Sequence, residues 1–177
     1  MTERDSSTSE YYFAYGSNMS AKYLKNVRKV SAVDSQRAVL ENYRLIFNLR
    51  GPNFLEPGFA NIAEYPDESI EGVLYKVSPS DLEKILGSEP DEYKIETVLV
   101  QGASGSIEAK TLIYVGGGST EYQPSRRYLN LLLKAGKNYQ LSNDYIAKLK
   151  STETVYYPVL SELFGSVIYA YIMLNSK

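Results

Sequence analysis

The sequence predicts an α+β fold: a small mixed β-barrel or sheet with a few helices packed against it. Segments with strand-like patterns are interrupted by amphipathic segments with helix-capping residues, in the order β-α-β-β-β-α-β-β-α-α. The 177 residues, 44% of them hydrophobic and 23% charged, fit one domain with a core of ordinary size. We expect residues 1–10 to form a disordered tail and residues 11–177 to form that single domain.

The first half of the chain begins with a strand over 11–15, which runs directly into a Gly-Ser-Asn turn. Ser20 is then placed to cap a helix over 21–29, and a strand with alternating apolar side chains covers 38–49. The loop over 50–58 is rich in turn residues and is a candidate border of a pocket. Two further strands are predicted over 59–63 and 70–77.

The second half contains the clearest helix start, Ser78 followed by Pro79, and Gly87 is the expected end of that helix. Two strands and two helices follow, over 93–100, 109–115, 125–135 and 142–150. The tyrosine-rich, apolar tail over 155–174 fits either a strand or a helix that covers the open end of a barrel.

The chain contains neither His nor Cys. This excludes Ser-His-Asp and Cys-His catalysis and zinc sites built from imidazole or thiolate, so proton transfer would fall to Glu, Asp, Lys or Tyr. We expect no cofactor and no metal site. A net charge of −2 argues against a nucleic-acid partner, and no apolar stretch is long enough to cross a membrane. We expect a cytoplasmic protein, in which the apolar residues 167–174 form an inner strand or a homodimer surface.

The turn Tyr15-Gly16-Ser17-Asn18-Met19 is the first candidate for a binding site, because it joins a strand to a helix-like segment. The first N–H groups of a helix have no internal partner, and a glycine lets a ligand approach the main chain closely. These N–H groups would suit a carboxylate or a developing oxyanion. The 17 tyrosines, against five phenylalanines, suit a pocket that is half apolar and half polar, or simply a strand-rich core.

Glu89 is the candidate acid/base among the 21 acidic residues. It follows a helix whose apolar face packs inward, and Pro90 restricts its backbone. Desolvation at the edge of an apolar cavity would raise the pKa of such a carboxyl towards a catalytically useful value. Asp91 and Glu92 are its close rivals.

These motifs together resemble the γ-glutamylcyclotransferase (AIG2-like) family. That family's loop is Tyr-Gly-Ser-Asn-Leu, from which only Met19 departs. The likeness continues through Gly58–Ile62 and Gly72–Val77, and Pro124–Tyr128 looks like the family's Pro-Ser-x-x-Tyr at the start of a late helix. The resemblance covers roughly residues 11–162.

The resemblance implies cyclisation of a γ-glutamyl group, with release of 5-oxoproline and a free amine or peptide. It assigns the catalytic position to Glu89 as the general acid/base. Seven residues would contact the substrate: Tyr15, Gly16, Ser17, Asn18, Met19, Tyr93 and Tyr128. Two departures touch the pocket rim, because Leu86 replaces an Asp and Pro90 replaces a Gly of the family pattern. These departures leave open a substrate other than that of the housekeeping activity.

Two other functions stay open at this point. One keeps Glu89 as acid/base but changes the reaction to that of a biosynthetic cyclase, lyase or isomerase acting on another small molecule. The other is a ligand-binding or interaction protein without turnover, which the presence of a carboxylate at Glu89 disfavours.

Overall fold

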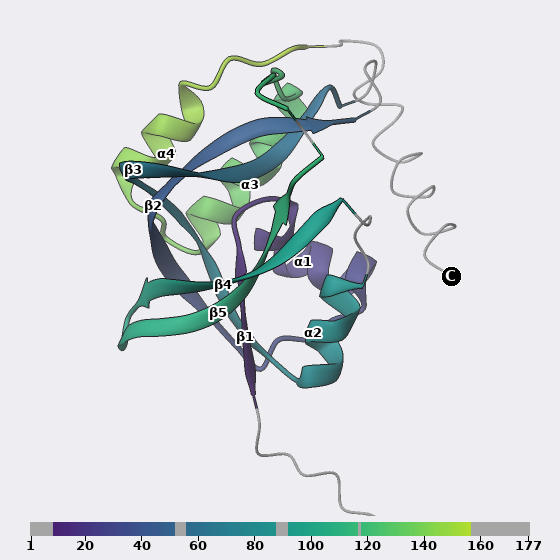
Figure 1. Ribbon diagram of the computed structural model, residues 1–177, viewed down its shortest axis with the longest axis vertical. Coiled ribbons are helices and arrows are strands. Elements are labelled where there is room, and N and C mark those ends of the chain that lie inside the picture. Colours follow the sequence, from purple (N-terminus) through teal and green to yellow (C-terminus); the bar gives the residue numbers. More distant parts are fainter. Residues whose placement is uncertain (1–8, 52–55, 88–91, 117, 157–177) are drawn as a thin grey trace, which may run out of the picture.

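The computed structural model describes residues 9–51, 56–87, 92–116 and 118–156 of the chain. Five strands form a closed barrel in the order β1-β3-β2-β4-β5, and helices pack around it (Figure 1). The strands are β1 (Glu10–Ala14), β2 (Asp34–Arg50), β3 (Gly58–Val77), β4 (Tyr93–Gly102) and β5 (Gly105–Tyr114). The α+β barrel predicted from the sequence is therefore confirmed.

The two longest strands, β2 and β3, pair in antiparallel register, and the observed extent of β3 corrects one prediction. The segments 59–63 and 70–77 are not separate strands, because β3 runs without a break through the polar residues between them. Asn42 and Asp67 have positive φ values of 61° and 65°, and the pairing register shifts beside Asn42. Residues 65–68 of β3 have no partner in the register with β2, so the exposed Pro66–Asp67 stretch is part of a bulge within β3.

The helical segment after β1 differs from the regular helix predicted over 21–29. A 3₁₀ turn (η1, Ser17–Met19) leads into one α-helical turn (α1, Ala21–Tyr23) and a π-helical turn (η2, Leu24–Arg28). Ser20 caps it as predicted, and Lys29 ends it in the left-handed conformation with φ of 56°. The wider turn brings Leu24 and Val27 into the core together.

Each of the three longer helices begins at a serine predicted from the sequence. They are α2 (Pro79–Leu86), α3 (Arg126–Asn138) and α4 (Asn143–Lys150). The hydroxyl oxygens of Ser78, Ser125 and Ser142 accept the N–H groups three residues further on, which satisfies donors that the helix leaves unpaired. Figure 1 shows α3 and α4 on one side of the β2–β3 ribbon. Among the described residues, no helix has both the length and the hydrophobicity needed to span a membrane.

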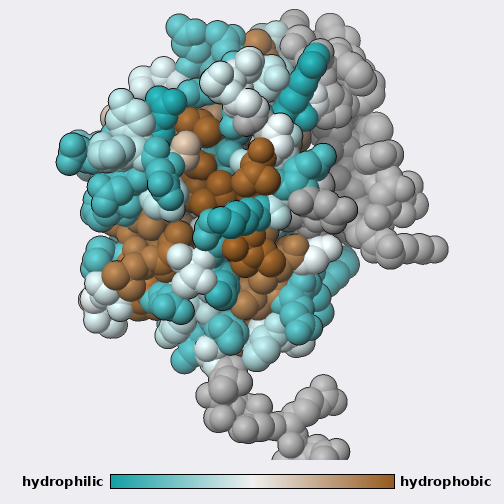
Figure 2. All heavy atoms as spheres, in the orientation of Figure 1, coloured by the Kyte–Doolittle hydropathy of each residue, from teal (hydrophilic) through white to brown (hydrophobic). Residues whose placement is uncertain are grey.

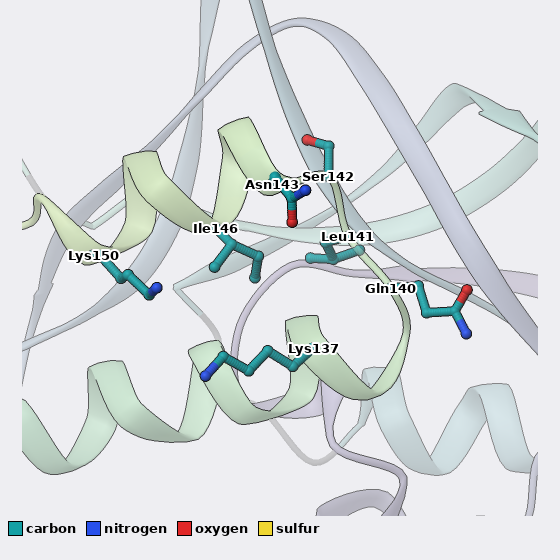
Figure 3. A pocket seen from close by; sticks show the side chains of 7 residues that line it. All are labelled: Lys137, Gln140, Leu141, Ser142, Asn143, Ile146 and Lys150. Carbon is teal, nitrogen blue, oxygen red and sulfur yellow. The ribbon is translucent and has the colours of Figure 1, made fainter.

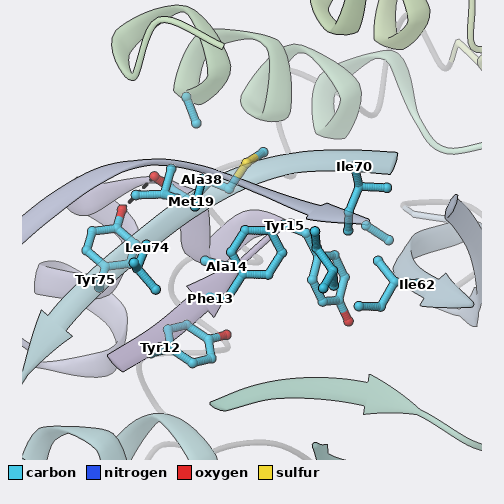
Figure 4. Packing of buried hydrophobic residues seen from close by; sticks show 14 of the residues in the cluster. Tyr12, Phe13, Ala14, Tyr15, Met19, Ala38, Ile62, Ile70, Leu74 and Tyr75 are labelled. Atoms are coloured by element: carbon cyan, nitrogen blue, oxygen red, sulfur yellow. Dashed lines mark hydrogen bonds between the residues drawn. The ribbon is translucent and has the colours of Figure 1, made fainter. Parts of the chain in front are cut away.

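A side-chain hydrogen bond helps to join β1 and β5, which pair over only a short stretch. β1 meets β5 in parallel register at Tyr12 and Lys110, and the buried Thr111 hydroxyl donates to the carbonyl oxygen of Phe13 over 2.9 Å. Phe13 itself is fully buried in the core drawn in Figure 4. On the face shown in Figure 2, hydrophobic side chains gather over the β4–β5 side, and Ile95 and Leu99 of β4 are about half exposed or more.

Candidate active site

The Tyr15–Met19 loop forms a tight turn directly after β1. The N–H group of Met19 donates to the carbonyl oxygen of Gly16 over 3.0 Å, and that of Ser20 donates to Ser17 over 3.1 Å. Within the described part of the chain, the N–H groups of Gly16 and Asn18 have no hydrogen-bond partner. The turn thus keeps two main-chain donors available for a ligand.

Tyrosines from two distant elements hold this loop in place. The Tyr128 hydroxyl oxygen, on α3, accepts the N–H group of Ala60 over 3.3 Å and lies beside Gly16. The Tyr75 hydroxyl, on β3, donates to the carbonyl oxygen of Met19 over 2.7 Å, the dashed line in Figure 4. Part of the tyrosine excess in the composition therefore serves to anchor the loop.

Two tyrosines from β1 and its end add to this anchoring. The Tyr15 hydroxyl donates to the carbonyl oxygen of Leu112 on β5. The side-chain amide of Asn18 donates to the Tyr12 hydroxyl over 2.9 Å. The other amide atom, Asn18 Oδ1, is buried and has no partner among the described residues. A buried acceptor without a partner is costly, so this oxygen is suited to receive a donor from a ligand.

Gly16 is required for close packing. A Cβ atom at this position would lie 3.3 Å from the Tyr128 hydroxyl oxygen and 3.5 Å from the Ala60 Cβ atom. The missing side chain therefore leaves room for Tyr128 on that side of the loop. The backbone of Gly16 has φ of −114°, which other residues also adopt, so the constraint is steric.

Asn61 is a buried residue of this region that the sequence did not single out. Its amide nitrogen donates to Asn48 Oδ1 and to the carbonyl oxygen of Tyr114, and its oxygen accepts the Tyr114 N–H group, each over 2.9 Å. Tyr15 also approaches this oxygen, at 3.5 Å. The side chain of Asn61 thus pairs with Tyr114 as a neighbouring strand would, and joins β3 to the end of β5. An isolated asparagine in a strand carries no pattern that predicts this.

Glu56 is the second such residue, and its carboxylate is fully buried. It accepts the N–H group of Ser125 over 2.7 Å and the Ser125 hydroxyl, and Arg127 Nη2 lies 3.5 Å away. Burial raises the pKa of the Glu56 carboxyl, and the Ser125 hydrogen bonds and the Arg127 charge oppose that rise. Glu56 lies in the predicted loop over 50–58, so this loop is tied to the start of α3.

The tyrosine hydroxyls of the site stay protonated in the ordinary pH range. Burial raises the pKa of Tyr128 and of Tyr75 above the ordinary tyrosine value. The Tyr128 oxygen accepts the Ala60 N–H group, and none of the described residues accepts the proton of its hydroxyl. Tyr128 is therefore a third donor beside the loop.

Glu89 lies outside the described residues, between the end of α2 at Leu86 and the start of β4 at Tyr93. Its rival Glu92 is described, and it is exposed in the turn before β4. The Tyr93 ring packs at 5.6 Å against that of Tyr114. Because Tyr114 pairs with Asn61, and Tyr15 approaches Asn61, Tyr93 stands at the same end of the barrel as the loop.

A surface pocket of about 500 Å³ lies elsewhere, between the end of α3 and α4 (Figure 3). Its lining comprises Lys137, Gln140, Leu141, Ser142, Asn143, Ile146 and Lys150, and none of the predicted site residues lines it. Among the described residues, no three acidic side chains are grouped as metal ligands would be.

Comparison with curated proteins gives relatives with one kind of activity in their names. "Gamma-glutamyl cyclotransferase gliK" of Aspergillus fumigatus is 25% identical over 173 residues, which cover 81% of this chain and 63% of that protein. The "Gamma-glutamylcyclotransferase" of Bos taurus is 29% identical over 148 residues, which cover 80% of this chain and 78% of that protein. The chain spans less than two thirds of the length of the Aspergillus fumigatus relative and of the Aspergillus oryzae relative aclK.

Solved structures share the fold. A structure titled "Gamma-glutamyl cyclotransferase" superposes with a TM-score of 0.75 at 22% identity, over 93% of this chain and 99% of that chain. YkqA from Bacillus subtilis superposes with a TM-score of 0.68 at 28% identity, over 85% of this chain and 57% of that chain.

The family described as "Gamma-glutamyl cyclotransferase, AIG2-like" matches residues 12–131, about two thirds of the chain. The matched range begins in β1 and ends within α3, so it contains the Tyr15–Met19 loop and Tyr128. This protein belongs to the γ-glutamyl cyclotransferase, AIG2-like family.

Proposed function

We propose that the chain catalyses the intramolecular cyclisation of a γ-glutamyl compound. The α-amine nitrogen of the γ-glutamyl group attacks its own γ-carbonyl carbon and forms the ring C–N bond. The bond to the leaving nitrogen then breaks, which releases 5-oxoproline and a free amine, amino acid or peptide. The nucleophile belongs to the substrate, so a chain without His or Cys can support this reaction.

The observation that carries the proposal is the set of three donors beside the end of β1. The N–H groups of Gly16 and Asn18 and the hydroxyl of Tyr128 have no acceptor within the described residues. Such donors suit the substrate carboxylate in the ground state, or the oxyanion that forms as the amine attacks. In other acyl-transfer enzymes, the loss of one oxyanion donor costs about 3–4 kcal/mol in the transition state.

The buried side-chain oxygen of Asn18 adds a hydrogen-bond acceptor to the same loop. Asn18 Oδ1 has no partner among the described residues, and an ammonium or amine group is the complementary donor. A γ-glutamyl group carries its carboxylate and its amine on one carbon atom. A loop with adjacent donors and an acceptor therefore matches that end of the substrate.

Glu89 is the proposed general acid/base. It would take a proton from the attacking amine and deliver it to the leaving nitrogen, so that proton and charge balance over the two steps. The family membership and the position of Glu89 between α2 and β4 support this role, and the exposure of Glu92 makes that neighbour the weaker candidate. Holding the substrate curled supplies proximity, for which oriented intramolecular reactions gain about 7–11 kcal/mol.

The test is an assay for 5-oxoproline. The purified protein is incubated with γ-glutamyl amino acids, γ-glutamylamines and glutathione, and the expected result is product from at least one class. A parallel incubation with α-glutamyl peptides is the control, because in these the peptide is attached at the α-carbonyl, so ring closure at the γ-carboxyl would release neither free 5-oxoproline nor the peptide. Absence of 5-oxoproline from every γ-glutamyl compound would overturn the proposal.

A further inference from the structure

A buried carboxylate that the proposed chemistry does not use lies at the start of α3. Glu56 is fully buried and accepts both the N–H group and the hydroxyl of Ser125. An ionised carboxylate only accepts hydrogen bonds, so the single hydroxyl proton of Ser125 is committed to Glu56. The lone pair of the Ser125 oxygen then faces the N–H group of Tyr128, which donates to it over 3.0 Å.

The same helical turn reaches the candidate site through the Tyr128 side chain. Its ring packs edge-on against Phe59 at 5.2 Å, and its hydroxyl oxygen accepts the N–H group of Ala60. Hydrogen bonds therefore run from Glu56 through Ser125 to the backbone of Tyr128, and the Tyr128 hydroxyl binds Ala60 beside Gly16 of the loop.

We propose that Glu56 is a positioning residue: it orients Ser125 and the first turn of α3, and thereby holds the Tyr128 hydroxyl against the Ala60 N–H group, beside Gly16 of the loop. Only the expected effect on turnover rests on the proposed function. The geometric part concerns the folded protein alone and can be tested without a substrate.

A matched arrangement lies at the start of α4. Glu71 is also buried, accepts the N–H group of the α4 cap Ser142 over 2.7 Å, and pairs with Arg37 at 2.8 Å. Ser142 in turn accepts the N–H group of Tyr145, three residues further on. Glu71→Gln is therefore a matched control, because it perturbs another helix start in which a buried glutamate binds the capping serine.

The experiment measures amide hydrogen exchange of Ala60 by NMR in the protein chain, for the wild type, Glu56→Gln and Glu71→Gln. The amide of the glutamine can donate to the Ser125 oxygen and reverse the polarity of the contact. We expect exchange at Ala60 to accelerate at least about tenfold in Glu56→Gln and to stay unchanged in Glu71→Gln, because protection follows the local opening of each hydrogen bond. Equal Ala60 exchange in both variants would overturn the proposal.

Turnover gives a second readout. With a γ-glutamyl substrate that the wild type converts, Glu56→Gln should lower kcat about tenfold and change KM little, since a displacement of about 1 Å costs up to about 100-fold. Glu71→Gln should leave kcat unchanged. A Glu56→Gln variant with wild-type kcat would contradict the positioning role even if its stability is reduced.

Two further outcomes, a Glu56→Gln variant that does not fold and a wild type without activity, can be told apart from a failure of the positioning role. If Glu56→Gln does not fold, Ser125→Ala replaces it, because this variant keeps the Ser125 N–H bond to Glu56 and removes the oxygen that accepts the Tyr128 N–H group. Faster Ala60 exchange in Ser125→Ala supports the proposal, and wild-type exchange overturns it. If the wild type converts no γ-glutamyl compound, the proposed function fails, while the exchange result still decides the role of Glu56.

Discussion

Tyr75 and Met19, 56 positions apart in the sequence, are joined by a hydrogen bond of 2.7 Å from the tyrosine hydroxyl to the methionine carbonyl oxygen. Both residues are almost completely buried. The bond links the middle of the barrel to the last residue of the candidate binding loop, so the loop shares the rigidity of β3.

Removing this bond should destabilise the protein. Tyr75→Phe keeps the ring and leaves the Met19 carbonyl oxygen buried without its donor, for which we expect a loss of about 1–3 kcal/mol in the free energy of unfolding. Denaturant titration measures it. Tyr139→Phe is the control, because the Tyr139 hydroxyl contacts only that of Tyr75 among the described residues, at 3.2 Å. Equal losses of unfolding free energy in the two variants would show that the bond to Met19 contributes no more to stability than the contact with Tyr139.

Gly16→Ala should lower stability through its contact with Tyr128. The new Cβ atom would lie 3.3 Å from the Tyr128 hydroxyl oxygen, and overpacking of this kind costs about 1–3 kcal/mol. In the Tyr128→Phe background the hydroxyl is absent, so the same substitution should cost less. A double-mutant cycle by thermal or chemical unfolding measures the coupling. Additive losses would mean that the two positions do not interact.

Glu89→Gln should reduce turnover by at least about a hundredfold, the lower range for loss of a positioned acid/base. The melting temperature should change little, because the exchange is nearly isosteric. The matched control is Glu92→Gln, which alters an exposed carboxylate three residues away. If Glu92→Gln abolishes activity while Glu89→Gln retains it, Glu92 is the catalytic carboxylate instead.

The rate should rise from weakly acidic to mildly alkaline pH. Glu89 must be ionised to accept a proton, and desolvation should move its acid limb above the free glutamate value of about 4.3. The substrate α-amine attacks only in its neutral form, which adds a rise on the alkaline side. The measurement is kcat/KM between pH 5 and 9, and no histidine contributes to it. A flat profile in a folded protein would exclude both titrations.

Glu56 should make the protein less stable as the pH rises. Burial raises the pKa of its carboxyl in the folded state, so between the unfolded and the folded pKa the folded protein binds more protons. The free energy of unfolding contributed by Glu56 therefore falls as the pH rises through this window. Denaturant titrations at pH 4.5 to 8 should show a smaller fall for Glu56→Gln than for the wild type. Parallel curves would mean that the folded pKa is not raised.

Local signals in the sequence predicted much of the fold. The serine caps at Ser78, Ser125 and Ser142 were predictable because each acts on an N–H group three residues away. The continuity of β3 was not, because the Glu64–Ser69 stretch looks like a turn, and only its two ends, Glu64 and Ser69, pair with β2. The π-helical end of the first helical segment likewise depends on how Leu24 and Val27 meet the core.

Some residues of the candidate site were likewise predictable from the sequence, and others were not. The Tyr15–Met19 loop could be found from its residues, and the resemblance pointed to Tyr128, which the structure places against Gly16. Glu56 and Asn61 could not be found, since their partners lie 69 and 53 residues away and no spacing rule connects them. Glu89 is outside the described residues, so its role stays a prediction.

The place of β1 in the barrel affects how the chain folds during synthesis. Its partner strand β5 lies far along the chain: Phe13 and Thr111, whose hydroxyl donates to the Phe13 carbonyl oxygen, are 98 positions apart. At about 5–20 residues per second, a ribosome needs roughly 5–20 s to bridge that interval. Contacts of such long range also form slowly, because the loop between them must close first. The strand that is synthesised first is therefore among the last to obtain all its partners, and its apolar side chains depend on β3 until then.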